Sequence, residues 1–208
     1  MSGGRFDAIL VDLDGVLRRW PTTDRAIETR FGLPEGAIRA EAFSSGRLDG
    51  AIRGTVTDAE WRRGVAEALR ERHPASDALA AVRAWSAGAG AVDRDALAPL
   101  LHHEPPGGIV LFTNATSRLD DDLEALGLTG VFRAVLNSSE LGAIKPEPEA
   151  FRAAIGACGG DAGRIVYVDD APGNVEAGRA AGIASHRYRT SRALERFLAD
   201  AFPAAGGR

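Results

Sequence analysis

The feature that most constrains the fold is a set of short apolar runs rich in β-branched residues. They lie at 6–14, 108–114, 134–137 and 164–170, with another at 183–188. They do not alternate strictly between polar and apolar residues, which is typical of strands in a parallel sheet that helices cover on both faces. Helical patterns separate the runs from residue 107 onward. We therefore expect a doubly wound, Rossmann-like α/β domain.

The helices expected between these runs have recognisable ends. The stretch 117–127 begins at Ser117, a residue type that caps helix N-termini, and ends at Gly127. Pro148 stands near the start of the next helical stretch, and Pro172 near the start of the one that follows 164–170. Proline is favoured in the first turn of a helix. These signals predict helices that connect successive parallel strands.

The long segment between the first two runs breaks the alternation. Residues 18–105 contain several helical patterns and no convincing strand. In the clearest of them, Thr57 and Glu60 form a capping-box pattern and Pro74 marks the end. A strand-to-strand connection needs far fewer residues than this segment has. We therefore expect a small helical cap over 18–105, inserted into a core domain made of 1–17 and 106–208.

Residues suited to binding or catalysis follow the predicted strands. They are Asp12, Asp14 and Gly15 after the first, Thr113 and Asn114 after the second, Lys145 in the loop after the third, and Asp169 and Asp170 after the fourth. Any one of these groups is ordinary by itself, as an acidic turn, a helix cap or a loop lysine. Their combined occurrence at strand ends is informative, because open parallel sheets bind ligands at the carboxyl ends of their strands.

The chemistry of this edge predicts phosphoryl transfer. Several carboxylates brought together repel one another, and Mg²⁺ relieves the repulsion because it prefers oxygen ligands. Lys145, Thr113 and Asn114 supply a cation and donors for phosphate oxygens, and Gly15 permits a sharp turn. A positioned carboxylate is a competent nucleophile. We interpret Asp12 as that nucleophile and Asp14, two residues later, as the general acid and base.

Four ordered motifs resemble those of the haloacid dehalogenase (HAD) superfamily, in its phosphatase-type branch with a small helical cap (subfamily I). They are DLDGVL at 12–17, LFTNAT at 111–116, IKPEPEAF at 144–151 and YVDDAPGNVEAGRAAG at 167–182. The resemblance implies the same roles for Asp12 and Asp14, and phosphoryl binding by Thr113 and Lys145 with Asn114 nearby.

The resemblance also implies a Mg²⁺ site. Its ligands are Asp12, the main-chain carbonyl of Asp14, and Asp170, with Asp169 acting through water or a neighbouring contact. Many phosphatases of the family have an aspartate four residues after the metal-binding one, where this chain has Asn174. Several members have asparagine there, so we expect metal binding to persist.

The implied function is a Mg²⁺-dependent phosphatase that acts on a small phosphorylated metabolite. Haloacid dehalogenases of the family lack the second aspartate of the first motif, so Asp14 favours phosphoryl transfer over carbon–halogen cleavage. The alternatives are a non-catalytic, regulatory phosphoryl-binding protein, a dehalogenase and a phosphomutase. In this family the cap closes over the site and selects the substrate. Candidate contacts for a distal anion of the substrate are Arg18, Arg19 and Trp20 after the first motif and Arg47 and Arg53 in the cap, and the alternative is that they are solvated surface residues.

Composition and charge exclude other classes of function. The net charge of -4 gives no general attraction to nucleic acid or anionic lipid. Neither a leader peptide nor a membrane-spanning apolar run is evident, so we expect a cytoplasmic protein. The single cysteine, Cys158, forms no internal disulfide and is interpreted as a structural thiol. The oligomeric state and the individual substrate are left open.

Overall fold

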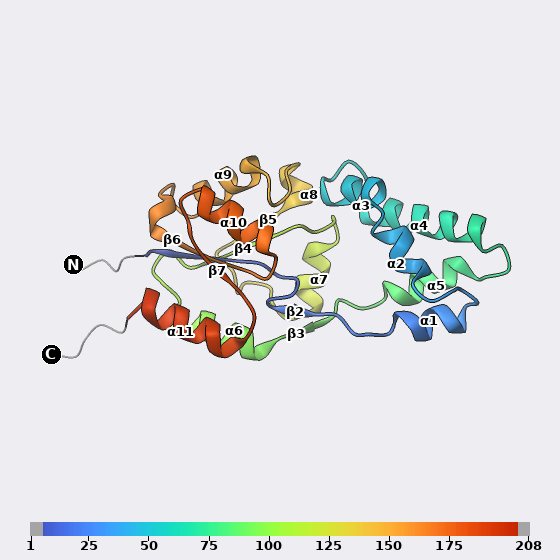
Figure 1. Ribbon diagram of the computed structural model, residues 1–208, viewed down its shortest axis with the longest axis horizontal. Helices are drawn as coiled ribbons and strands as arrows, with labels where there is room; N and C mark the ends of the chain where they lie inside the picture. The colour runs from blue at the N-terminus through green and yellow to red at the C-terminus, as the bar shows by residue number, and fades with distance from the viewer. Residues whose placement is uncertain (1–5, 204–208) are drawn as a thin grey trace.

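A computed structural model describes residues 6–203 (Figure 1). In this range five parallel strands form one sheet in the order β5-β4-β1-β6-β7. The strands are β1 (Ala8–Val11), β4 (Ile109–Thr113), β5 (Ala134–Asn137), β6 (Ile165–Asp169) and β7 (Ala184–Arg187). The five predicted strands and the doubly wound α/β fold are thus confirmed.

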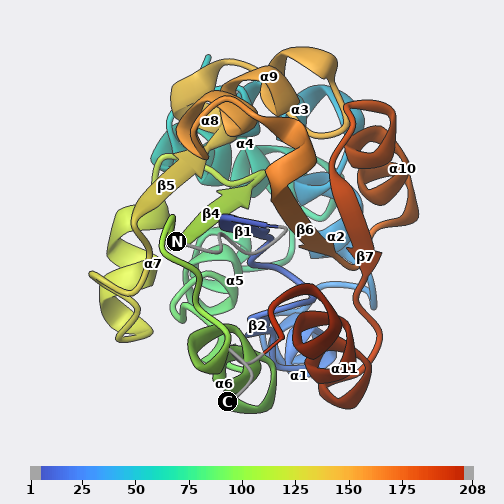
Figure 2. The same cartoon turned by 90° about the vertical axis from the view of Figure 1, so that its left-hand side faces the viewer.

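Helices cover both faces of this sheet, as the fully buried central strands β1, β4 and β6 require (Figure 2). Successive side chains on β1 point to opposite faces, so Ile9 and Val11 join one buried cluster and Leu10 joins another. The first face is covered by α6 (Arg94–His102), α7 (Leu119–Ala125) and α11 (Ser191–Ala201). The second face is covered by α8 (Ser138–Leu141), α9 (Pro148–Ala157) and α10 (Pro172–Ala180). A short 3₁₀ turn, Ala162–Arg164, precedes β6.

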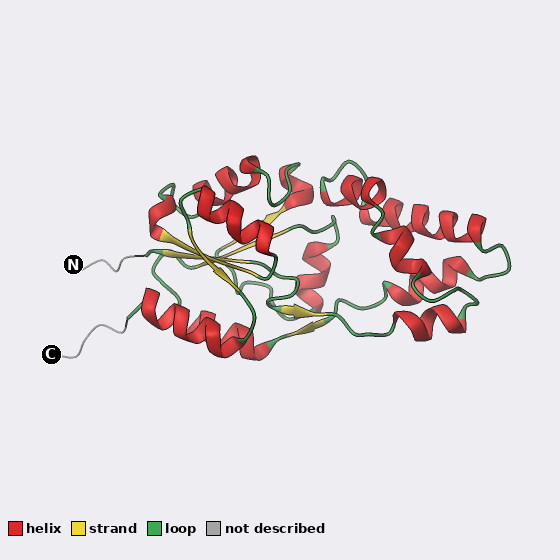
Figure 3. Ribbon diagram, viewed as in Figure 1, coloured by secondary structure: helices red, strands yellow, loops and turns green. Residues whose placement is uncertain are grey.

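The cap is a separate helical unit that lies beyond the carboxyl ends of the strands (Figure 3). It contains α1 (Asp24–Arg30), α2 (Ala37–Ala42), α3 (Ser45–Ile52), α4 (Asp58–Arg72) and α5 (Ala78–Trp85), which bury an apolar cluster of their own. The cap therefore has its own core. The predicted capping box is also present, since Thr57 and Glu60 bond each other's backbone N–H groups at the start of α4.

Two short strands connect the cap to the core. β2 (Arg18–Arg19) and β3 (Ala91–Val92) pair in antiparallel fashion where the chain leaves the core and returns to it. They lie inside the segment for which no strand was expected. Two-residue strands carry too little pattern to be recognised in the sequence, because alternation becomes visible only over longer runs.

The predicted cap boundary at residue 105 differs from the packing. The helix α6 lies inside the range 18–105, yet Ala96 and Leu100 belong to the same buried cluster as Ile9 of the central strand. The unit that packs as a cap therefore ends before α6. A helical pattern shows which face of a helix is apolar but not which partner covers that face.

Ser117 does not cap the helix that it was expected to cap. Arg118 occupies the N-cap position of α7 and makes no side-chain capping bond. The Ser117 hydroxyl instead accepts a hydrogen bond from the backbone N–H of Asp58, the first residue of α4, at 3.0 Å. This contact joins the core to the cap.

None of the helices in residues 6–203 is both long and apolar enough to cross a membrane.

Candidate active site

Lys145 lies at the centre of the carboxyl edge of the sheet. Its Nζ atom is 2.7 Å from Asp12 Oδ1 and 2.8 Å from Asp169 Oδ2, and it donates to the Phe112 carbonyl at 2.8 Å. Lys145 is the only lysine in the sequence and is 3% exposed. The structure thus brings the ends of β1, β4 and β6 together with Lys145, as predicted, but Lys145 lies between α8 and α9 and not in a loop directly after β5.

Burial and charge oppose each other at this lysine. Burial alone would lower the pKa of Lys145, but the neighbouring Asp12 and Asp169 more than reverse this and hold the pKa above its usual value. Burial likewise raises the pKa of Asp12 to about 6, with Lys145 acting in the opposite direction and Asp169 adding to the rise. The ammonium therefore offsets much of the cost of burying the two acids.

Protein donors surround Asp169. Its Oδ2 atom accepts from Lys145 and from the Tyr167 hydroxyl, and its Oδ1 atom accepts from the backbone N–H of Ala171 at 2.8 Å. The amide of Asn174 donates to the same carboxylate at 3.1 and 3.2 Å. Asn174, which stands where many phosphatases of the family have an aspartate, is therefore a neutral donor beside the buried Asp169 carboxylate. Asp169 thus connects Lys145 and Tyr167 with the start of α10.

Three carboxylates converge on a position suited to a metal ion. Oxygen atoms of Asp12, Asp169 and Asp170 lie within 4.8 Å of one another, and Asp170 is exposed. Burial and the charge of Asp169 raise the pKa of Asp170. Three negative charges against the single charge of Lys145 leave an excess of two, which one divalent cation balances. The donor set therefore fits Mg²⁺, because it consists of hard oxygen ligands on the open side of a buried cluster.

Gly15 permits the close approach of Asp170 to the turn after β1. Gly15 has a φ of +82°, a conformation that residues with a Cβ atom rarely adopt. A Cβ atom placed there would lie 2.3 Å from Asp170 Oδ2. The predicted role of Gly15 was to let backbone amides approach a bound group, whereas the structure shows that it makes room for a carboxylate.

We expect Gly15→Ala to disrupt the carboxylate cluster. The substitution combines an unfavourable φ, which costs roughly 1–3 kcal/mol, with a clash against Asp170. Gly130→Ala is the matched control, because Gly130 has a φ of +77° and no atom within 4 Å of its added Cβ. Calorimetric Mg²⁺ titration should show weakened binding for Gly15→Ala and unchanged binding for Gly130→Ala. Equal Mg²⁺ affinity in the two variants would contradict this reading of Gly15.

Thr113 is the last residue of β4, and Asn114 follows it. The Asn114 amide donates to the Lys145 carbonyl at 2.9 Å and accepts from the Lys145 backbone N–H at 2.8 Å. This reciprocal pair fastens the lysine loop to the end of β4. Thr113 is 1% exposed beside it. Asn114 was expected near the phosphoryl group, and the structure gives it a second task, which is to hold the backbone of Lys145.

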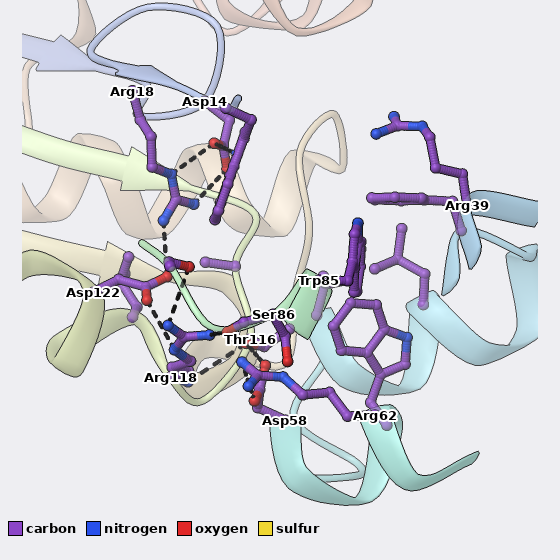
Figure 4. Close-up of a pocket in the computed structure, with 18 of the residues that line it drawn as sticks. Asp14, Arg18, Arg39, Asp58, Arg62, Trp85, Ser86, Thr116, Arg118 and Asp122 are labelled. Atoms are coloured by element: carbon purple, nitrogen blue, oxygen red, sulfur yellow. Dashed lines mark hydrogen bonds and ion pairs between the residues drawn. The ribbon is translucent and has the colours of Figure 1, made fainter. Parts of the chain in front are cut away.

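The Asp14 side chain lies outside the carboxylate cluster of Asp12, Asp169 and Asp170. Arg18 donates to both of its oxygens, at 2.8 and 2.7 Å, and the Trp20 indole donates at 2.7 Å. Arg18 is 4% exposed and also donates to Asp122 at 2.8 Å (Figure 4). Arg18 is therefore a buried partner of Asp14 and not a surface residue.

The network around Asp14 extends to the connection between core and cap. Asp122 also pairs with Arg118 at 2.9 Å, and Arg118 donates to the carbonyls of Ser86 and Gly88, just after the last cap helix. Asp122, Arg118 and Tyr167 were not among the residues predicted for the site. Asp122 and Arg18 are 104 positions apart, so no local pattern could have paired them.

Cys158 follows α9 and packs, partly buried, against the apolar cluster that contains Phe112 and Phe151. Burial raises the pKa of Cys158 from its usual 9.0 to about 11. The thiolate fraction at pH 8 is then lower by about a hundredfold, because each unit of pKa changes that fraction tenfold. We therefore expect iodoacetamide to alkylate Cys158 about a hundredfold more slowly in the native protein than in the protein unfolded by urea. Similar rates in the two states would show that the thiol is not shielded.

Comparisons with known proteins point to one family. A family model described as haloacid dehalogenase-like hydrolase matches residues 6–182. The enolase-phosphatase E1 of Streptomyces avermitilis is 29% identical over 189 residues, which cover 87% of this chain and 72% of that protein.

Solved structures share the fold. A HAD family enzyme from Bacteroides thetaiotaomicron, in complex with magnesium and inorganic phosphate, has a TM-score of 0.67 and 20% identity over 89% of this chain and 95% of its own. The L-2-haloacid dehalogenase of Xanthobacter autotrophicus has a TM-score of 0.64 and 20% identity over 96% of this chain and 85% of its own. At such identities these structures show a common fold and no more. The family model, which spans most of the chain, shows that this protein belongs to the haloacid dehalogenase-like hydrolases.

Proposed function

We propose that this hydrolase is a Mg²⁺-dependent phosphatase that transfers the phosphoryl group of a small phosphorylated metabolite to Asp12. One observation carries the proposal: the Lys145 ammonium lies between Asp12 and Asp169 in a cluster of carboxylates that also includes Asp170. This arrangement positions a carboxylate nucleophile beside a fixed cation and beside oxygen ligands for a divalent metal.

The first step forms an aspartyl-phosphate. An Asp12 oxygen attacks phosphorus as the bond to the leaving oxygen breaks, and Asp14 gives that oxygen a proton. In the second step Asp14 takes a proton from water, the water oxygen attacks phosphorus, and inorganic phosphate leaves as the bond to Asp12 breaks. Thr113 and Lys145 bind the phosphoryl oxygens in both steps.

The metal site consists of Asp12, the main-chain carbonyl of Asp14 and Asp170 in this proposal. Asp169 holds Lys145 and the start of α10 in place through its hydrogen bonds. When bound, Mg²⁺ supplies positive charge that offsets the negative charge of the phosphoryl oxygens. This role accords with the excess negative charge of the carboxylate cluster.

Asp14 must change partners to act as an acid. In the structure its carboxylate accepts hydrogen bonds from Arg18 and Trp20. We infer that the leaving-group oxygen of the substrate displaces one of these donors when it enters. Arg18 would then act as a positioning residue that keeps Asp14 at the border of the site between turnovers.

The relatives support phosphoryl transfer. The Streptomyces avermitilis protein is an enolase-phosphatase, and the Bacteroides thetaiotaomicron enzyme binds magnesium and inorganic phosphate. The Xanthobacter autotrophicus enzyme acts on haloacids, but Asp14 and the carboxylate cluster favour a phosphatase for this chain.

A turnover assay tests the proposal. Purified protein should hydrolyse 4-nitrophenyl phosphate with Mg²⁺, should lose this activity in EDTA and should regain it when Mg²⁺ is restored. It should release no chloride from 2-chloropropionate. Chloride release without metal would identify a dehalogenase, and binding of phosphate without turnover of any phosphate ester would identify a non-catalytic receptor.

A further inference from the structure

A cavity of about 360 Å³ lies between the cap and the core. On the core side it is lined by Asp14, Asn114 and Thr116, so it reaches the catalytic edge of the sheet. Figure 4 shows Asp14 and Arg18 on one side of the close-up and Arg39 and Trp85 of the cap on the other. A substrate whose phosphoryl group lies at Asp12 would extend its leaving group into this space.

The walls of the cavity are rich in aromatic side chains. All three tryptophans of the chain line it, together with Phe43. Phe43 is 46% exposed and Trp20 is 49% exposed, although large apolar side chains are usually buried. Phe43 and Trp61 both contact the Trp85 ring, with centroids 6.2 and 5.9 Å away. The cavity thus offers apolar surface that a ligand can cover.

The arginines that line the cavity are all paired with aspartates that also line it. The pairs are Arg18 with Asp14 and Asp122 at 2.7 and 2.8 Å, Arg118 with Asp122 at 2.9 Å, Arg62 with Asp58 at 2.6 Å, and Arg39 with Asp24 at 3.4 Å. Four arginines and four aspartates leave no net charge. Neither lysine nor histidine is among the residues that line this cavity.

On the basis of the proposed phosphatase activity, we propose that this cavity binds the uncharged, apolar leaving group of a phosphate monoester and disfavours leaving groups that carry a second anion. The aromatic walls stabilise an apolar group by removing its surface from water. A second anion would lose its hydration there without meeting an unpaired cation, and the neutral lining offers no net attraction to offset that cost. The cap thereby selects monoesters over bisphosphates and phosphorylated carboxylic acids.

The first test compares two esters of similar size. With Mg²⁺, kcat/KM for 4-methylphenyl phosphate should exceed that for 4-carboxyphenyl phosphate by about tenfold or more, the scale on which a pocket discriminates between related groups. Equal values, or a preference for the carboxylated ester, would overturn the proposal.

Variants locate the selectivity in the cavity. Phe43→Ala should lower kcat/KM for 4-methylphenyl phosphate by about tenfold, since it removes an aromatic contact surface. Leu79→Ala is the matched control, because Leu79 is a cap residue that is 52% exposed and does not line the cavity. Asp24→Asn frees Arg39 from its ion pair. This variant should raise kcat/KM for 4-carboxyphenyl phosphate relative to kcat/KM for 4-methylphenyl phosphate. The proposal fails if Phe43→Ala and Leu79→Ala behave alike, or if Asp24→Asn leaves the selectivity unchanged.

A binding measurement separates this inference from the proposed function. Because all three tryptophans line the cavity, their fluorescence reports occupancy with the non-hydrolysable 4-methylbenzylphosphonate and 4-carboxybenzylphosphonate. The dissociation constant of 4-methylbenzylphosphonate should be about tenfold lower than that of 4-carboxybenzylphosphonate. Turnover of acetyl phosphate without this selectivity would refute the cavity assignment and support the phosphatase. Selective binding without turnover of any phosphate ester would refute the phosphatase and support the cavity assignment.

Discussion

Replacing Asp12 by asparagine is expected to abolish hydrolysis of phosphate esters while the protein stays folded. The amide has nearly the size of the carboxylate but is a poor nucleophile, and removal of such a group lowers kcat by about 10⁴-fold or more. Asp12 is 6% exposed and pairs with Lys145. The variant therefore has one buried negative charge fewer, and Lys145 still pairs with Asp169, so the protein should stay folded. The rate of phosphate release and the far-ultraviolet circular dichroism are the measurements.

Asp7→Asn is the control for this substitution. Asp7 precedes the other end of β1 and pairs with Arg164. Its side chain is 46% exposed, so loss of this pair should change neither the fold nor the turnover appreciably. If Asp12→Asn turned over substrate at the rate of the parent protein, Asp12 would not be the nucleophile, and another group of the site would have to receive the phosphoryl group.

Replacing Lys145 by methionine is expected to reduce both stability and activity. The substitution leaves Asp12 and Asp169, which are 6% and 0% exposed, without the cation that both of them contact. Breaking a buried ion pair in this way costs about 3–5 kcal/mol of the free energy of unfolding. Urea denaturation at pH 8 without Mg²⁺ should show this loss, and phosphate release should fall to background.

The loss of stability in Lys145→Met should depend on pH. Without the ammonium the pKa of Asp12, about 6 in the parent protein, rises further, because Lys145 acts to lower it. A folded-state pKa above the unfolded value contributes stability at low pH that disappears as the pH rises. The difference from the parent protein should therefore grow from pH 5 to pH 8.

Two further variants test the reasoning about Lys145. Lys145→Arg should not restore activity, because a planar guanidinium cannot replace a compact ammonium that contacts three acceptors in a closed site. Arg152→Met removes a cation from an ion pair on the surface, where the side chain of Arg152 is 70% exposed, and should cost little. A similar loss of stability in Arg152→Met and Lys145→Met would show that burial of the charge is not the cause.

Much of the core fold could be predicted from local patterns. The three central strands β1, β4 and β6 could be recognised because strands buried on both faces are continuous apolar runs. The start of α4 could be recognised because a capping box is encoded within four residues. The placement of α6 could not be predicted. Its apolar stripe fits either a cap or a sheet, and the choice depends on the surfaces that remain uncovered after the rest of the chain has folded.

The residues that the proposal places in the catalytic centre were likewise visible in the sequence. The positions of Asp12, Lys145, Asp169 and Asp170 follow from the strands that precede them, because parallel strands align their carboxyl ends at one edge. The partners of Asp14 could not be predicted. Arg18 meets Asp122 across 104 positions, and side-chain pairs at such separations are set by packing.

Local patterns in the sequence were enough to establish the order of the strands along the chain, the polar groups that end them and the family to which the protein belongs. Tertiary structure decided how those groups share their charge: that Lys145 bridges two acids, that Gly15 makes room for Asp170, and that the arginines lining the cavity between cap and core are paired with aspartates. The physical reason is that secondary structure depends on neighbours along the chain. Charge balance and burial depend on neighbours in space, which only the folded chain brings together.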